Sequence, residues 1–286
     1  MNLYSINTGY FKLDGGAMFG VVPKSIWHKI NPADENNMCS WALRCLLVED
    51  GERLILIDNG MGNKQDAKFF GYYFLHGDDT LDKSLSRHGF HRNDITDVFL
   101  THLHFDHCGG SICRENGMLV PAFKNAEYWS NQDHWNWAIR PNEREKASFL
   151  KENILPIEES GQLKFVEVAN GEEGRLGKTN FSPVLDTRFV NGHTKDMMLP
   201  QIKYKDKTIV YVADLLPSAG HIPIPYVMAY DMFPLTTLNE KKSFLKEAVE
   251  NDYILFFEHD AVHECCTLQA TEKGIRPKEF FKLEDI

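Results

Sequence analysis

Three histidines and one aspartate lie within a stretch of six residues, a density that ordinary core or surface composition seldom produces. They are His102, His104, Asp106 and His107. Neutral imidazole and carboxylate groups are the usual ligands of zinc in hydrolytic sites. His102 and His104 alternate by two, so an extended backbone would send both side chains to the same side, with Asp106 and His107 on the turn that follows. The segment therefore predicts a loop that binds metal.

Three more candidate ligands lie farther along the chain, each shortly after a predicted strand. They are His193, Asp214 and His259. The carboxyl ends of strands are where α/β sheets build their sites, and His102 also follows an apolar run. Any one of the three could be a buried polar residue without a function. Together with the first cluster they predict a site for two divalent metal ions, with zinc as the expected metal and iron, manganese or cobalt as alternatives.

Hydrophobic patterns predict the elements that must position these residues. Residues 41–48 and 53–57 are apolar runs joined by a polar turn with Gly51, which is typical of an antiparallel pair. Further strands are predicted at residues 98–100, 163–168, 181–190, 199–204, 208–213 and 253–257.

Helices are predicted between several of these strands. They cover residues 81–88, residues 142–153 within an inserted segment of about 129–160, and a run from a cap at Asn239 to Glu250. Gly109 and Gly110 would let the backbone turn tightly beside the metal-binding loop, and a glycine-rich turn is predicted at residues 171–177.

Length and composition favour one folded unit. We predict a single domain over residues 1–286, built of two related halves, because folds of this size often form one unit. With 43% apolar and 25% charged residues the composition is ordinary for a globular protein, so the chain should fold compactly. The formal charge of -10 disfavours nucleic acid as a partner. No run of about 20 apolar residues and no signal peptide is recognised, so we expect a cytoplasmic protein without membrane contact. The six cysteines show no C-x-x-C spacing, so neither a zinc ribbon nor a disulfide framework is indicated.

The order of the candidate ligands resembles that of the metallo-β-lactamase superfamily. The match consists of His102-x-His104-x-Asp106-His107, then His193, Asp214 and His259, and it extends over nearly the whole chain. The resemblance implies an α/β fold, the four-layer αβ/βα sandwich.

The resemblance also implies a role for each ligand. One metal would be bound by His102, His104 and His193, and the other by Asp106, His107 and His259, with Asp214 bridging the two. Asp58, in a strand that ends Asp-x-Gly as in the family, would orient a ligand.

Such a metal pair would supply a bridging hydroxide as the nucleophile, so no catalytic serine or cysteine is needed. Asp106 and Asp214 are therefore the expected catalytic carboxylates, and Asp106 could pass a proton to the leaving oxygen.

Within the superfamily, the chain looks most like the acyl-homoserine lactone lactonases and their methyl-parathion-hydrolase-like relatives. This resemblance implies a quorum-quenching lactonase. Four residues near the start could wall a groove for an acyl chain, namely Met18, Phe19, Ile26 and Trp27. They would look identical as plain core or as the surface of a homodimer. One departure is Pro217, which stands where the lactonases carry a tyrosine three residues after the bridging aspartate. His221 and Tyr226, in the proline-rich stretch that follows, could replace the function of its hydroxyl, although such a stretch is also typical of a rigid loop.

Two alternatives to a lactonase stay open at the level of sequence. The same metals would serve a phosphotriesterase or broad esterase, because they stabilise a pentavalent centre as readily as a tetrahedral one. A metal-binding sensor without catalysis is the alternative from another class, although it would gain little from a complete pair of open metal sites.

Overall fold

The structure is a computed structural model that describes residues 1–171 and 176–286. Its internal contacts divide the chain into two compact units. The first comprises Met1–Gly9 and Leu43–Glu167, and the second comprises Tyr10–Ala42 and Val168–Ile286. The single domain over residues 1–286 stays a prediction, and most of the glycine-rich turn predicted at 171–177 lies outside the described residues.

The first unit contains most of a six-stranded sheet with the strand order β1-β2-β3-β4-β7-β8. The strands are β1 (Asn2–Asp14), β2 (Met38–Asp50), β3 (Arg53–Ile57), β4 (Asp97–Phe99), β7 (Glu127–Ser130) and β8 (Leu163–Phe165). β2 and β3 are antiparallel, as the turn at Gly51 predicted, whereas β3, β4, β7 and β8 run parallel. β1 and β2 continue into the residues of the second unit.

Parallel neighbours need a crossover connection, and helices supply it in this unit. The helices are α3 (Ala67–Tyr73), α4 (Leu81–Arg87), α5 (Phe105–Cys108), α6 (Gln132–Ile139) and α7 (Lys151–Glu159), and a small hairpin is formed by β5 (Ile112–Glu115) and β6 (Met118–Pro121). α4 connects β3 to β4, starts at a Thr80 cap and ends before Gly89, which confirms the predicted helix. Buried residues such as Leu56, Val98 and Trp135 form the core between these helices and the sheet.

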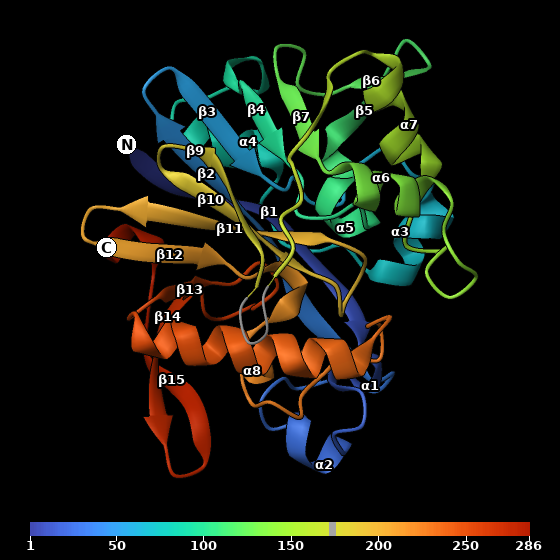
Figure 1. Cartoon of the computed structure of the whole chain (residues 1–286). Coiled ribbons are helices and arrows are strands. Elements are labelled where there is room, and N and C mark those ends of the chain that lie inside the picture. Colours follow the sequence, from blue (N-terminus) through green and yellow to red (C-terminus); the bar gives the residue numbers. More distant parts are fainter. Residues whose placement is uncertain (172–175) are drawn as a thin grey trace. The chain divides into compact units, whose positions relative to one another are not determined.

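The second unit contains a seven-stranded sheet with the order β15-β14-β13-β12-β11-β10-β9 (Figure 1). The strands are β9 (Lys178–Ser182), β10 (Leu185–Val190), β11 (Met197–Tyr204), β12 (Lys207–Tyr211), β13 (Ile254–Phe256), β14 (Cys265–Thr271) and β15 (Gly274–Phe281). Its helices are α1 (Gly15–Phe19), α2 (Lys24–Trp27) and α8 (Pro234–Glu250). β12 and β13 are parallel, so they require a crossover, which α8 provides while it contacts β14 and β15 (Figure 1).

Two predicted helices differ from the observed ones. Residues 142–153 do not form one helix, because Asn142 Oδ1 accepts hydrogen bonds from the backbone N–H groups of Arg144 and Glu145 and so closes a turn instead. α8 starts at Pro234 and not at a cap at Asn239, since proline is well suited to the first turn of a helix. The hairpin of β14 and β15 was not predicted at all.

No helix among the described residues combines the length and apolar character that a membrane crossing requires.

Candidate metal centre

In the first unit the chain leaves β4 and enters a short buried loop that carries His102 and His104. Their rings are nearly perpendicular, and His102 Nε2 lies 3.0 Å from His104 Nδ1. The ring of His107, on α5, lies with its centroid 3.9 Å from that of His102. Asp106 Oδ2 lies 3.8 Å from His107 Nε2. This unit therefore gathers the three histidines and the aspartate of the predicted loop.

Asp58, at the end of β3, holds this loop from behind. Its Oδ1 accepts a hydrogen bond from the Thr101 backbone N–H at 2.8 Å, and its Oδ2 accepts one from the Thr101 hydroxyl at 2.7 Å. His107 Nδ1 lies 3.1 Å from the same Oδ2. A carboxylate only accepts, so Nδ1 of a neutral His107 carries the proton and Nε2 is the nitrogen available for a metal.

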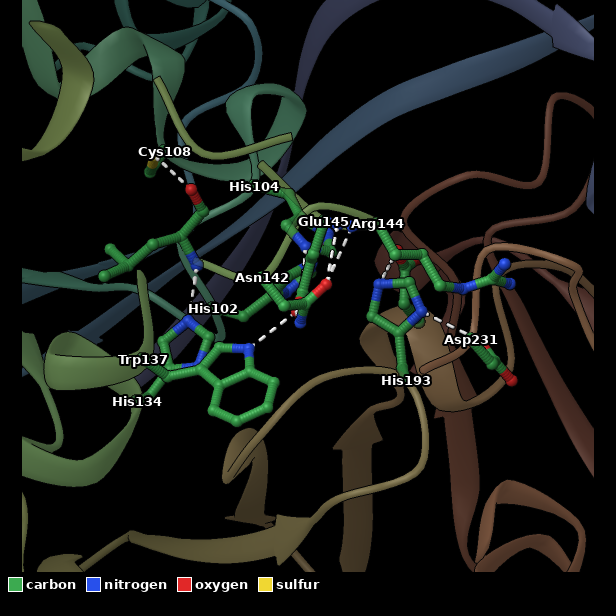
Figure 2. A network of polar contacts seen from close by, with 12 residues as sticks. His102, His104, Cys108, His134, Trp137, Asn142, Arg144, Glu145, His193 and Asp231 are labelled. Carbon is green, nitrogen blue, oxygen red and sulfur yellow. Dashed lines mark hydrogen bonds and ion pairs between the residues drawn. The ribbon is translucent and has the colours of Figure 1, made fainter. Parts of the chain in front are cut away.

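Glu145 plays the corresponding part for His104. Its carboxylate is almost fully buried, and its Oε1 lies 3.0 Å from His104 Nε2 (Figure 2). Oε2 accepts a hydrogen bond from the Trp137 indole at 2.6 Å. The proton of His104 therefore belongs on Nε2, and Nδ1 is the nitrogen available for a metal.

His102 is oriented by Thr101 in a similar way. Because the Thr101 hydroxyl gives its only proton to Asp58, it must accept from His102 Nδ1, which lies 3.1 Å away. His102 Nε2 is then left without a proton, like Nδ1 of His104. Two lone pairs thus face each other across 3.0 Å in a buried place, an arrangement that a shared cation would stabilise.

Close packing of two loops explains the glycines after this cluster. A Cβ atom on Gly109 would lie 2.2 Å from the Met61 carbonyl oxygen, and one on Gly110 would lie 2.3 Å from that of Asn59. Gly109 has an ordinary helical φ of -61°. These glycines are therefore required for close approach of the backbone and not, as we predicted, for a tight turn.

In the second unit Asp214 lies between two histidines. One carboxylate oxygen is 3.1 Å from His193 Nε2, and the other is 3.3 Å from His259 Nε2. All three side chains are buried. β12 and β13 are parallel neighbours, so Asp214 and His259 follow strand ends at the same edge of the sheet.

The two histidines beside Asp214 also have their other ring nitrogen paired. His193 Nδ1 lies 2.8 Å from Asp231 Oδ1, and His259 Nδ1 lies 2.8 Å from the Ala42 carbonyl oxygen. Burial disfavours a charged ring, but the carboxylates of Asp214 and Asp231 outweigh it and raise the pKa of His193 to about 10. The same carboxylates that stabilise a proton on this ring would also stabilise a metal ion bound at Nε2.

Two non-glycine residues beside these donors have backbone angles in the left-handed region. φ is +54° at Asp58 and +40° at Ala213, the residue before Asp214. Such conformations cost about 1–3 kcal/mol and concentrate at functional sites, where the surrounding structure maintains them. Strained backbone thus lies at Asp58 and directly before Asp214.

The residues predicted to contact the substrate, as groove wall or in place of the lactonase tyrosine, lie in the second unit, and most of them are packed. Met18, Phe19 and Trp27 are buried, and the ring of Phe19 stacks on those of Trp27 and His221. His221 is bonded through both ring nitrogens, to the Ser218 hydroxyl at 2.8 Å and the Met18 carbonyl oxygen at 2.9 Å. These contacts fit the alternative of plain core, and burial lowers the pKa of His221 to about 3, so its ring is neutral.

The other two residues of that set are more accessible. Ile26 is 47% exposed, and Tyr226 is partly buried with its ring edge toward Phe19. Pro217, which stands at the position of the lactonase tyrosine, is buried, and its carbonyl oxygen accepts a hydrogen bond from the His259 backbone N–H. The acyl groove stays a prediction.

Sequence reasoning identified the donors but missed most of the residues that orient them. Glu145 and Asp231 were not singled out, because a lone carboxylate in a polar segment resembles any surface residue. The fact that each histidine needs a partner for its second nitrogen was the one available signal, but it does not say where that partner lies in the chain.

The similarity of this chain to known proteins points to one superfamily. The sequence pattern of the metallo-beta-lactamase superfamily matches residues 44–259. An N-acyl homoserine lactonase of Bacillus thuringiensis is 29% identical over 164 residues, which are 54% of this chain and 56% of the relative. One of Bacillus cereus is 28% identical over 142 residues, 46% of this chain and 50% of the relative. The matched segments thus span about half the length of these lactonases.

Solved structures show the same fold over almost the whole chain. A probable metal-dependent hydrolase from Staphylococcus aureus has a TM-score of 0.87 at 26% identity, with 99% of this chain and 97% of the other covered. AidC, described as a dizinc quorum-quenching lactonase in complex with a product, has a TM-score of 0.77 at 24% identity, with 98% and 95% covered. The α/β fold expected from the sequence is thereby confirmed.

Proposed function

The chain belongs to the metallo-beta-lactamase superfamily, and from that premise we propose that it is a two-metal hydrolase that opens the lactone ring of N-acyl homoserine lactones. The observation that carries the metal part is the pair of facing ring nitrogens on His102 and His104. The names of the relatives, which include several N-acyl homoserine lactonases, support the substrate.

Each unit would contribute ligands to both ions. We assign His102, His104 and His193 to one ion, and Asp106, His107 and His259 to the other. Asp214, which faces His193 and His259 with one oxygen each, would bind both. Convergence of the two sets of donors is part of the proposal. Zinc is the expected metal, although iron, manganese and cobalt accept the same donors.

A bound pair of divalent ions lowers the pKa of water and polarises the carbonyl of an ester. The residues of this chain would do the rest. Asp106, whose side chain is only slightly exposed, would hold a proton and pass it to the ring oxygen as the ester bond breaks. Asp58, Glu145 and Asp231 would keep the ligand rings in place.

The test is a proton-release assay on purified protein loaded with zinc. Acyl-homoserine lactones of short and long chain should each release one proton per ring opened. Loss of a hydrogen-bond partner of a ligand typically reduces activity by about 10- to 100-fold. Because His104→Ala removes a proposed ligand itself, it should reduce the rate by more than that. If the wild-type protein releases protons no faster than His104→Ala with every lactone, the lactonase activity is excluded.

A phosphotriester assayed beside the lactones separates the esterase alternative. We expect kcat/KM to be higher for a lactone, and the reverse order would make phosphotriesters the substrate class. Elemental analysis should find two equivalents of metal. Quorum quenching, residence in the cytoplasm, the absence of nucleic-acid binding and a homodimer stay predictions.

A further inference from the structure

Three consecutive residues of the metal-binding loop are bonded to one segment of the first unit, residues 131–148, which we call the clamp segment. The Leu103 backbone N–H donates to His134 Nε2 at 2.9 Å, and His104 Nε2 lies 3.0 Å from Glu145 Oε1. The Phe105 backbone N–H donates to the Ser148 carbonyl oxygen at 3.0 Å. In Figure 2 Glu145 lies beside His104, and His134 of the same segment is drawn with them.

The polar groups of the clamp segment are themselves held in place. His134 is fully buried, and its backbone N–H donates to Asn131 Oδ1 at 2.8 Å at the start of α6. Its Nε2 accepts from Leu103, so a neutral ring carries its proton on Nδ1. The backbone between His102 and His104 is thus fixed by a histidine that is not itself a ligand in our assignment.

Glu145 is fixed through both oxygens. Oε1 faces His104, while Oε2 accepts from the Trp137 indole at 2.6 Å and from the Asn142 side chain at 3.4 Å. The carboxylate therefore cannot rotate away from His104 without breaking bonds to α6 and to the turn after it. A buried carboxylate is costly unless it is fully paired, and here the pairing ends on a candidate ligand.

We infer that the clamp segment is a positioning device for the metal site, and that Glu145 determines which nitrogen of His104 faces the metal. The inference rests on the proposed function in so far as His104 is a ligand. Glu145 places the proton on Nε2 and presents Nδ1, while His134 and Ser148 set the backbone on either side. These are positioning residues, since they act through His104 and its neighbours.

The first test reads the position of the proton directly. Long-range ¹H–¹⁵N spectra of the histidine rings should show His104 protonated at Nε2 in the wild-type protein, both without metal and with zinc. A wild-type His104 protonated at Nδ1 would overturn the inference. A wild-type protein with the Nε2 proton but no uptake of metal would leave the inference standing and refute the proposed function.

The second test compares two variants of equal charge. In Glu145→Gln an amide N–H group must face either His104 or Trp137, both donors, so His104 should lose its single tautomer. Zinc affinity, measured by competition with a chelator, should fall by about 10- to 100-fold. Glu143→Gln removes the same charge from an exposed side chain two residues away and should change neither reading.

Equal tautomer populations and zinc affinities in Glu145→Gln and Glu143→Gln would contradict a positioning role. Trp137→Phe keeps the carboxylate but removes its indole donor, so it should weaken zinc binding in the same direction and by less than Glu145→Gln. This milder variant decides the matter should Glu145→Gln fail to fold, and unchanged zinc affinity in Trp137→Phe would then count against the clamp.

Discussion

At the scale of single residues, the candidate site is organised by the second nitrogen of each histidine. Thr101, Asp58 and Glu145 accept from rings in the first unit, and Asp231 and the Ala42 carbonyl accept from rings in the second. Each partner fixes which ring nitrogen keeps its proton, so the other nitrogen is the one that would bind a metal. These hydrogen-bond partners hold rings in one orientation that could otherwise rotate about their side-chain bonds.

Asp58→Asn tests one of these partners. The new amide would turn an N–H group toward either Thr101 or His107, where the native carboxylate accepts three hydrogen bonds. We expect zinc affinity to drop by about 10- to 100-fold in a chelator competition. Asp66→Asn is the control, because that exposed residue caps α3 and asparagine caps equally well. Unchanged affinity in Asp58→Asn would show that the contact does not orient His107.

At the scale of elements, the loop that carries the candidate ligands of the first unit depends on a close approach between its own C-terminal end and the loop after β3. Gly109→Ala would place a methyl group against the Met61 backbone, and overpacking of this kind costs about 1–3 kcal/mol or more. The variant should unfold at a lower denaturant concentration and bind zinc less tightly. In Gly71→Ala, on exposed α3 with open space around the new Cβ, stability should rise slightly. Similar stability in the two variants would refute this account.

α8 carries a buried lysine that holds the proline-rich loop before the helix. Lys241 is fully buried, and its Nζ donates to the carbonyl oxygens of Pro223, Ile224 and Tyr226. Burial lowers the pKa of Lys241 to about 7. The unfolded chain therefore binds more protons between that value and the ordinary 10.5, and the free energy of unfolding should increase with pH in this window.

Lys241→Met removes the titrating group. Urea unfolding measured from about pH 7 to about pH 9.5 should show a rise in wild-type stability that the variant lacks. Lys242→Met, at the exposed neighbouring position, should follow the wild type. A variant at position 241 that keeps the same slope would show that this lysine is charged in the folded protein.

At the scale of the whole molecule, the proposed metals would link donors from both units of the chain. Binding to the folded state alone stabilises a protein by about 2.7 kcal/mol when the free ligand is at 100 times its Kd. Removal of metal by a chelator should therefore lower Tm, and added zinc should restore it. In His104→Ala the difference in Tm between the chelator-treated and the zinc-loaded protein should be much smaller. If neither the chelator nor added zinc changes the Tm of the wild-type protein, the proposal of ions shared by the two units is contradicted.

The sequence alone was enough to name the candidate metal ligands and to predict strands that precede them. Local information carries both, since ligand types are visible as residues and strands as apolar runs between turns. The segments at residues 53–57 and 98–100, and the ligand-type residues behind strand ends, were predicted in this way, and the superfamily and its α/β fold are confirmed.

The orientation of the candidate ligand side chains was decided only by the tertiary structure. Glu145 reaches His104 across 41 residues and Asp231 reaches His193 across 38, and no local pattern records such partners. The turn at Asn142 likewise replaced a predicted helix because a side chain competed for backbone N–H groups. A tautomer is set by the hydrogen-bond partner that folding brings to the ring, so it is a property of the packed chain and not of its sequence pattern.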